Sequence, residues 1–229
     1  MLKQFKPLII FANAYDCYPA IEGVNLLPAD KLMINYYPYP ENYYQAEKFL
    51  KDKPDYTHIL YVSPDVVLDR YTYDCMVKNL IQFDYDVYGC CLNVDTDVYQ
   101  DFLACTIKLP ALEYINRRYR WVKEHHRQIM LKGGITQMNV KFNAGFHFIK
   151  REIKDKIPYT TLPYPTDERP IWESLGGYAC DLALSHWLDF MNIPIILDLR
   201  YKVKHLRYAG PLMVGKKEPE IKFIKYEEN

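Results

Sequence analysis

The apolar residues of this chain fall into short runs separated by polar loops, and in the first half two kinds of run take turns. Continuous apolar stretches predict buried strands, and apolar groups at helical spacing predict helices. The predicted strands cover residues 8–12, 31–35, 58–62 and 87–94, and the predicted helices cover residues 43–51 and 71–83. Strands without polar alternation that take turns with helices are typical of a mostly parallel central sheet with helices on both faces.

The second half of the chain is less regular. The elements predicted there are a long helix over residues 110–131, a strand or hairpin over 140–150, a helix over 179–191 and a strand over 193–199. We expect one α/β domain over residues 1–229, in which 1–95 form a nucleotide-binding half, 96–210 an acceptor-binding half and 211–229 a polar tail.

Charge and cysteine content narrow the class of protein. Lysine plus arginine and aspartate plus glutamate both number 29, so the net charge is zero, which argues against a dedicated nucleic-acid binder. The six cysteines form no CxxC pair, and several lie in apolar runs. We therefore expect reduced thiols in a cytoplasmic protein, with disulfides left open. No apolar run approaches the ~20 residues of a membrane span, and Pro7 favours a first strand over a secretion signal.

One stretch, "HILYVSPDVVLD", reads as a buried strand that runs into an acid. In an open parallel sheet, ligands bind at the carboxyl ends of the strands, and Asp65 comes just after such an end. A carboxylate there can hold a divalent cation that faces a diphosphate. Ser-Pro-Asp is also ordinary turn chemistry, so this stretch by itself leaves both interpretations open.

The order of motifs along the chain resembles GT-A-type nucleotide-sugar glycosyltransferases. The Asp-x-Asp motif of that family corresponds to Ser63-Pro64-Asp65, in which serine replaces the first acid. A glycine-containing strand corresponds to "FNAGFHFIKRE", an acid that opens a helix to Asp181 in "GGYACDLALSHWL", and a strand that ends in histidine to His205. The resemblance implies a single Rossmann-like domain of the GT-A type.

The resemblance also implies roles at the diphosphate. Asp65 and His205 would hold Mn²⁺ or Mg²⁺, and a nitrogen ligand favours Mn²⁺. Ser63 would offer a weaker hydroxyl ligand, so metal dependence stays open. Lys204 would share the diphosphate charge, unless it only belongs to a solvated basic strand edge. Asp181 would be the general base, although the helix dipole alone also favours an acid there.

The nucleoside and sugar would meet other residues. By resemblance, Gly145 lies where the family brings backbone close to the donor or acceptor sugar. The loop after the first strand offers Asn13, Tyr15 and Asp16 to the nucleoside, and Asn35 ends the second strand. Tyrosine is common throughout the chain, with 22 residues, so a structural role for Tyr15 stays open.

These features lead us to expect a hexosyltransferase-like enzyme that moves a sugar from a nucleotide-diphospho-sugar to an unknown acceptor. A non-catalytic nucleotide- or sugar-binding module is the alternative, because Ser63 lacks the carboxylate. A sugar nucleotidyltransferase is disfavoured, because the loop "NAYDCYP" has no glycine with which to grip a triphosphate. The tyrosine-rich, glycine-poor composition resembles small glycosyltransferases encoded by viruses of heat-loving archaea, which would place the protein in the host cytoplasm.

Overall fold

The structure is a computed structural model of the chain. It describes residues 5–38, 41–94, 104–105, 137–140, 142–143, 146–157, 179–206 and 210–227. The helix expected over residues 110–131 lies outside the described residues, as does Gly145.

The described residues form one main sheet of nine strands. Its central strands, in spatial order, are β2 (Asp30–Asn35), β1 (Pro7–Asn13), β3 (His58–Val62), β9 (Phe146–Lys150), β5 (Val87–Val94) and β10 (Ile195–His205). All of these run in one direction except β9, which lies antiparallel between β3 and β5. The expected α/β fold with a mostly parallel central sheet is therefore confirmed, while the antiparallel place of β9 was not predicted.

The remaining strands lie at the borders of the sheet. β11 (Glu220–Ile224) pairs antiparallel with β2 at one edge, and β4 (Val66–Val67) and β7 (Gln137–Val140) pair antiparallel with β10 near the other. β6 (Ala104–Cys105) and β8 (Phe142–Asn143) form a separate small ladder.

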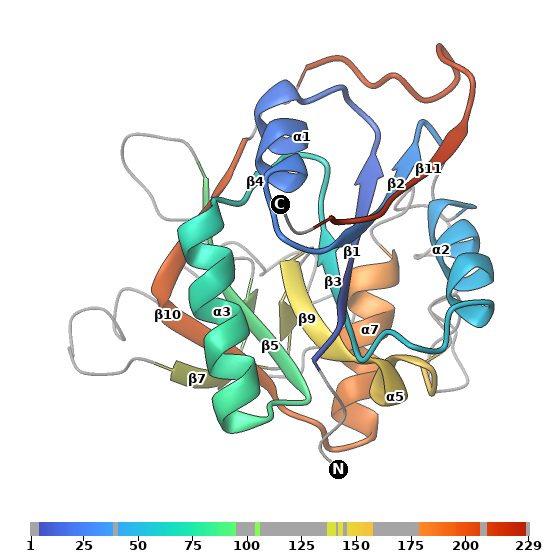
Figure 1. The fold of residues 1–229 in the computed structure, drawn as a ribbon. Helices are drawn as coiled ribbons and strands as arrows, with labels where there is room; N and C mark the ends of the chain where they lie inside the picture. Colours follow the sequence, from blue (N-terminus) through green and yellow to red (C-terminus); the bar gives the residue numbers. More distant parts are fainter. Residues whose placement is uncertain are drawn as a thin grey trace.

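Helices cover both faces of the sheet, as expected (Figure 1). α1 (Tyr18–Asn25) and α3 (Arg70–Phe83) pack on one face, and α2 (Glu41–Lys51), α5 (Arg151–Lys154) and α7 (Ala179–Phe190) pack on the other. β1 shows why its apolar residues do not alternate with polar ones. Leu8 and Ile10 belong to the core under α2 and α7, whereas Ile9 and Phe11 belong to the core under α1 and α3.

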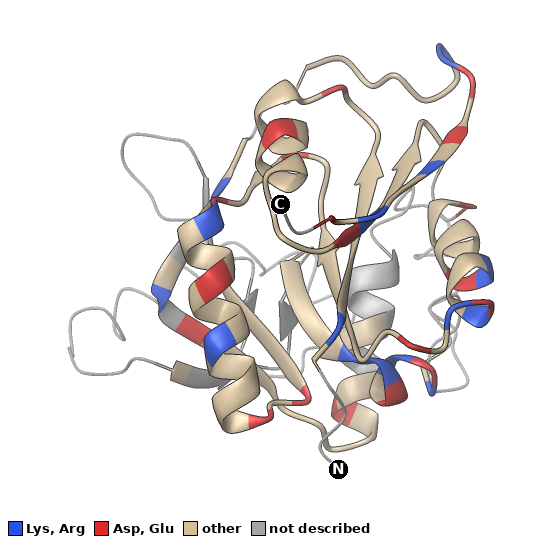
Figure 2. Ribbon diagram, viewed as in Figure 1, with Lys and Arg blue, Asp and Glu red and all other residues tan. Residues whose placement is uncertain are grey.

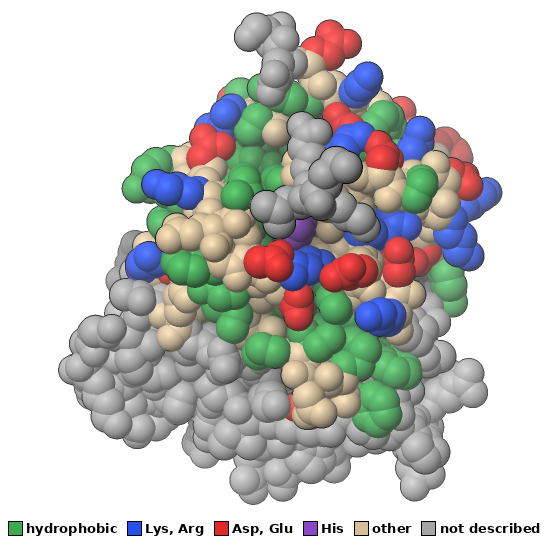
Figure 3. Space-filling view, turned by 60° about the horizontal axis from the view of Figure 1, so that its bottom comes forward, with side chains coloured by type: hydrophobic (Ala, Val, Ile, Leu, Met, Phe, Trp, Pro, Cys, Tyr) green, Lys and Arg blue, Asp and Glu red, His purple; other side chains and the backbone are tan. Residues whose placement is uncertain are grey.

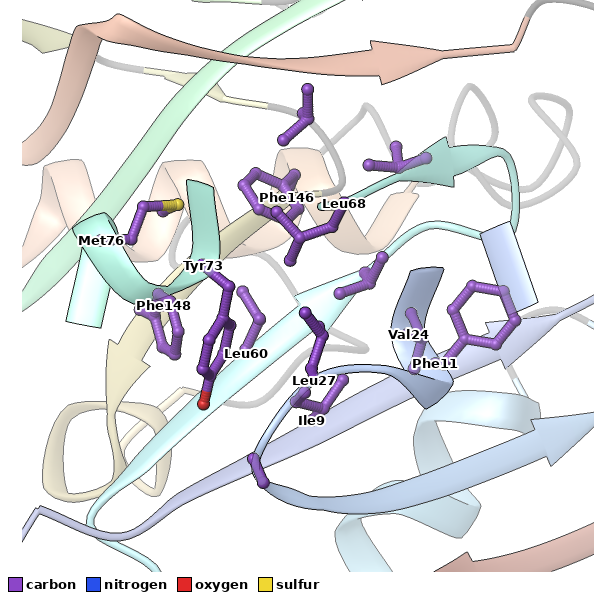
Figure 4. Packing of buried hydrophobic residues seen from close by; sticks show 14 of the residues in the cluster. Ile9, Phe11, Val24, Leu27, Leu60, Leu68, Tyr73, Met76, Phe146 and Phe148 are labelled. Atoms are coloured by element: carbon purple, nitrogen blue, oxygen red, sulfur yellow. The ribbon is translucent and has the colours of Figure 1, made fainter. Parts of the chain in front are cut away.

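The core under α1 and α3 is built from all parts of the fold. Figure 4 shows Phe11 of β1, Val24 of α1, Tyr73 of α3 and Phe148 of β9 among the residues packed together. All four are at most 2% exposed. β9 comes from the second half of the chain, so the two halves share one core.

Two segments differ from the expectations. Residues 13–19 were expected to form a loop, but α1 begins at Tyr18, with Pro19 in its first turn, where a missing N–H costs nothing. The expected polar tail contains the strand β11. Its side chains are mostly exposed because it forms the edge of the sheet, although Phe223 contacts Phe49 of α2, so an ordinary buried-strand pattern is absent.

Candidate functional site

The acid after β3 lies in a tight turn. The backbone N–H of Val66 donates to the carbonyl of Ser63 at 3.1 Å, with Pro64 and Asp65 at the two central positions. The chain then enters β4, which pairs with the end of β10. The turn therefore carries Asp65 from the end of β3 to the end of β10, along the carboxyl-end edge of the sheet.

His205 meets Asp65 at this edge. It is the last residue of β10 and lies opposite Val66 in the ladder with β4. Its Nε2 is 3.0 Å from Oδ2 of Asp65, and the N–H of Leu206 donates to the carbonyl of Asp65 at 2.8 Å. The Asp65 and His205 side chains are 23% and 20% exposed. The structure thus brings together the two expected metal ligands, which are far apart in the sequence, and leaves both accessible.

The geometry of this pair fits a divalent cation. Two neighbouring ligands of an octahedral ion, each about 2.1 Å from it, lie about 3.0 Å apart. The observed separation also suits a direct hydrogen bond from imidazole to carboxylate. Asp65 and His205 form a pair, and within the described ranges no group of three or more His, Cys, Asp or Glu side chains comes together. Nδ1 of His205 is buried without a hydrogen-bond partner among those residues.

The second acid of the same stretch, Asp69, has a structural role. Asp69 is the N-cap of α3 and accepts hydrogen bonds from the backbone N–H and the hydroxyl of Thr72, both at 2.8 Å. This is ordinary helix capping. Asp65 makes no such cap, which separates a structural acid from a candidate ligand four residues before it.

The other residues expected near the diphosphate and the sugars are Ser63, Lys204, Asp181 and Gly145. Ser63 opens the turn before Asp65. Lys204 is exposed and precedes His205 on β10, where neighbouring side chains point to opposite faces, so it lies on the face away from the pair. Asp181 has its backbone in the first turn of α7, which lies toward the carboxyl ends of β1 and β3 (Figure 1). Its side chain and Gly145 lie outside the described residues.

The residues expected to meet the nucleoside form a connected group at the ends of β1 and β2. The Asn13 amide donates to the Asn35 side-chain oxygen at 3.1 Å, and Oδ1 of Asn13 accepts from the N–H of Asp16 at 3.2 Å. The Asp16 carboxylate in turn accepts from the hydroxyl of Tyr36. Tyr15 lies in the same loop and is partly buried.

Three residues of this group were missed by sequence reasoning. Tyr36 follows β2 directly, and its N–H donates to the carbonyl of Asn13 at 2.8 Å. Lys217 donates to the Asp16 carboxylate, and Glu220 accepts from the Asn35 amide at 3.1 Å. Lys217 and Glu220 belong to the segment expected to be a polar tail, and nothing in their local sequence marks them.

Electrostatics hold this group together. Burial by itself would raise the pKa of Asp16, but hydrogen bonds from Lys217 and Tyr36 outweigh it and lower that pKa. The hydrogen bond to Asp16 raises the pKa of the Tyr36 phenol and that of the Lys217 ammonium. Asp16 is therefore a carboxylate and Lys217 an ammonium over the whole physiological range.

Two buried polar residues elsewhere are structural. His147 is 3% exposed on β9, opposite Tyr61 of β3, and burial lowers its pKa to about 4. Asp198 is fully buried and accepts hydrogen bonds from Arg200, from Tyr88 at 2.6 Å and from Gln137 at 3.2 Å. The pairing of β10 with β5 shifts just after Asp198, so this carboxylate stabilises an irregular stretch of strand.

Basic and acidic residues are mixed on the face of the molecule in view. Figure 2 marks both kinds along α3, and in Figure 3 basic and acidic side chains lie side by side. This agrees with the zero net charge. Among the helices that the structure describes, none is both long enough and apolar enough to span a membrane.

Comparison with known proteins bears on the fold. No protein-family model matches this chain, and no curated protein matches it. Among solved structures the chain is similar to the crystal structure of A197 from STIV, an archaeal virus, with a TM-score of 0.53 and 14% sequence identity. The match covers 98% of this chain and 96% of the other. At this identity the similarity concerns the fold alone.

Proposed function

We propose that this protein is a glycosyltransferase of the GT-A type that uses a nucleotide-diphospho-sugar as donor and is assisted by a divalent cation. One observation carries the proposal: Asp65 and His205, the two metal ligands that the sequence and the family resemblance led us to expect, lie 3.0 Å apart at the carboxyl-end edge of the sheet. Ligands of open α/β sheets bind at that edge.

The chemistry of sugar transfer suits this arrangement. When the bond between the anomeric carbon and the diphosphate breaks, negative charge accumulates on the leaving diphosphate. A cation held by Asp65 and His205 would stabilise that charge as a Lewis acid. The Asp65 carboxylate and the His205 imidazole both remain accessible at the edge for this purpose.

The residue proposed to activate the acceptor lies at the start of α7. A helix that begins at the carboxyl-end edge places its first residues next to a bound donor, and Asp181 is one of them. A carboxylate there can take the proton from an acceptor hydroxyl as it attacks the anomeric carbon. The acceptor hydroxyl would come from a protein, a lipid or a glycan.

A non-catalytic nucleotide- or sugar-binding module is the second candidate. It is favoured by Ser63, which replaces the first carboxylate of the Asp-x-Asp motif with a neutral hydroxyl. Such a module would bind the nucleotide sugar at the same edge without turning it over.

Calorimetry with UDP and GDP, each with and without Mn²⁺, tests the proposal. We expect one of them to bind, and Mn²⁺ to tighten that binding. Asp65→Asn should weaken the Mn²⁺-dependent binding about 10- to 100-fold, the usual effect of disturbing a metal site. Asp74→Asn is the matched control, because it makes the same charge change on an exposed helix position, where Asp74 pairs with Arg70.

Turnover separates the two candidate functions. If nucleotide binds but the sugar of the matching donor is neither transferred nor hydrolysed, the binding module is correct. In an active enzyme, Asp181→Asn should lower turnover by about 10²- to 10⁴-fold and leave nucleotide affinity nearly unchanged. An absence of any nucleotide binding to the wild-type protein would refute the transferase and the nucleotide-binding module, and would leave only a module that binds sugar.

A further inference from the structure

The C-terminal segment over residues 210–227 crosses the carboxyl ends of β1 and β2 and touches the loops that follow them (Figure 1). The N–H of Met213 donates to the carbonyl of Ala14 at 2.9 Å. Farther along, β11 pairs with β2 over its whole length, and Glu220 accepts from the Asn35 amide. The segment therefore borders the edge at which the nucleoside is expected.

Two residues of this edge have unusual backbone conformations. Asp16 has a φ of 54° and Tyr36 a φ of 62°, in the left-handed region that non-glycine residues rarely adopt. The other described non-glycine residues with positive φ, Asp84 and Asn192, lie one and two residues after the ends of helices, where this conformation is a common helix ending. Asp16 and Tyr36 end no helix, so surrounding contacts must hold them, and strain of this kind often accompanies ligand sites.

Lys217 makes those contacts. Its ammonium donates to the Asp16 carboxylate and, at 3.3 Å, to the Tyr36 hydroxyl, and it lies 5.0 Å from the centre of the Tyr36 ring. The Tyr36 hydroxyl donates in turn to Asp16. One lysine from the C-terminal segment thus joins the loop after β1 to the residue after β2, and it is the cation that faces the Asp16 charge.

We propose that Lys217 is a positioning residue of the nucleotide site and that the C-terminal segment is a working part of that site. This inference rests on the proposed function. Lys217 holds Asp16 and Tyr36 in the conformation that meets the ligand, and it offsets the Asp16 charge next to a ligand that is itself anionic.

The ligand class follows from the groups that remain available. The Asp16 carboxylate has about four acceptor positions, of which Tyr36 and Lys217 take two, and its side chain is 18% exposed. It can therefore still accept hydrogen bonds from ligand hydroxyls. The ammonium has a third N–H for a ligand oxygen, and Lys217 is 43% exposed. A nucleoside diphosphate offers both hydroxyl donors and anionic oxygens.

Calorimetric Kd values for UDP and GDP with Mn²⁺ test this inference on the full-length protein. We expect Lys217→Met to weaken the binding of the preferred nucleotide about tenfold, as loss of a charged hydrogen bond does. Lys217→Arg should restore affinity to within about threefold. Lys216→Met removes the same charge from the neighbouring exposed residue and should leave the Kd unchanged.

A double-mutant cycle tests whether Lys217 acts through Asp16. If it does, the variant that combines Lys217→Met with Asp16→Asn should bind no more weakly than Asp16→Asn by itself. A purely structural lysine would lower Tm but leave the Kd of the folded protein unchanged at 25 °C. If Lys217→Met does not fold, Tyr36→Phe removes the hydroxyl that joins the same groups and is expected to weaken binding as well.

The outcomes are distinguishable. If the wild-type protein binds neither nucleotide, the proposed function fails and this inference falls with it. If the wild-type protein binds but Lys217→Met, or Tyr36→Phe in its place, binds equally well, only this inference is overturned. Tighter binding by Lys217→Met would also overturn it, because the segment would then compete with the ligand.

Discussion

The side chain of His147 provides a direct test of whether the core around β9 excludes water. It is 3% exposed on the central strand β9, its ring centre lies 5.9 Å from that of Tyr61, and its Nε2 has no hydrogen-bond partner among the described residues. Burial lowers its pKa from 6.5 to about 4. The folded protein therefore keeps His147 neutral at a pH at which the unfolded chain would protonate it.

The size of the effect follows from that difference in pKa. Above pH 6.5 both states carry a neutral imidazole, and the contribution of His147 to stability is fully present. As the pH falls from 6.5 toward 4, the unfolded chain takes up a proton that the folded protein does not, so stability is lost. Over this window, at 1.36 kcal/mol per pH unit, the loss amounts to about 3 kcal/mol.

Urea unfolding of the wild-type protein and of His147→Phe, at pH 7 and at pH 4, measures this loss. Phenylalanine fills a similar space without a titratable group, so the wild-type protein should lose about 3 kcal/mol more than the variant. At pH 7 the variant should be as stable as the wild type, or about 1 kcal/mol more stable, because no buried nitrogen is left unpaired. His58, whose pKa burial also lowers to about 4, is present in both proteins and cancels in the comparison.

An equal loss of stability in the two proteins would refute the interpretation. The same holds if the NMR signals of the His147 ring titrate near pH 6.5 in the folded protein, because the ring would then be accessible to water. Either result would mean that His147 is not a buried structural residue.

Two further predictions concern contacts of the segment that leads from β3 to α3. Gly23→Ala should destabilise the protein by about 1–3 kcal/mol although alanine favours helices, because the added Cβ would lie 2.8 Å from the carbonyl oxygen of Leu68; thermal unfolding checks this, and a stabilised variant would contradict the close approach. Asp69→Ala should cost about 1 kcal/mol through the lost cap of α3 and leave nucleotide affinity unchanged, whereas Asp69→Asn should cost only a few tenths; a changed Kd would show that Asp69 belongs to the site.

The local pattern of apolar residues was sufficient to predict the strands that are buried on both faces of the sheet. The strand over residues 58–62 matches β3, and that over 87–94 matches β5, because a continuous apolar run has few other stable arrangements. The order of β9 between β3 and β5 was out of reach. Its sequence is equally apolar in either direction, and only the pairing of β9 with both neighbours makes it antiparallel.

In the candidate site, too, some residues could be predicted from the sequence and others could not. Asp65 was identified from its place just after a strand end, where ligands of open α/β sheets bind, and His205 was identified by the family resemblance. Lys217 and Tyr36 were missed. Their importance comes from contacts across the edge, made by the segment that leads into β11, whose exposed side chains resemble those of an ordinary polar tail.

The sequence by itself determined the α/β class, most strands and helices of the first half and the place of Asp65 after a strand, because each follows from short-range periodicity and from the position of polar residues after apolar runs. His205 came from the family resemblance. Tertiary structure alone decided that His205 contacts Asp65 rather than solvent, that Asp69 caps a helix, and that Lys217 joins Asp16 to Tyr36. The physical reason is that a hydrogen bond or ion pair depends on distances of a few ångströms, and only the packing of distant segments sets those distances.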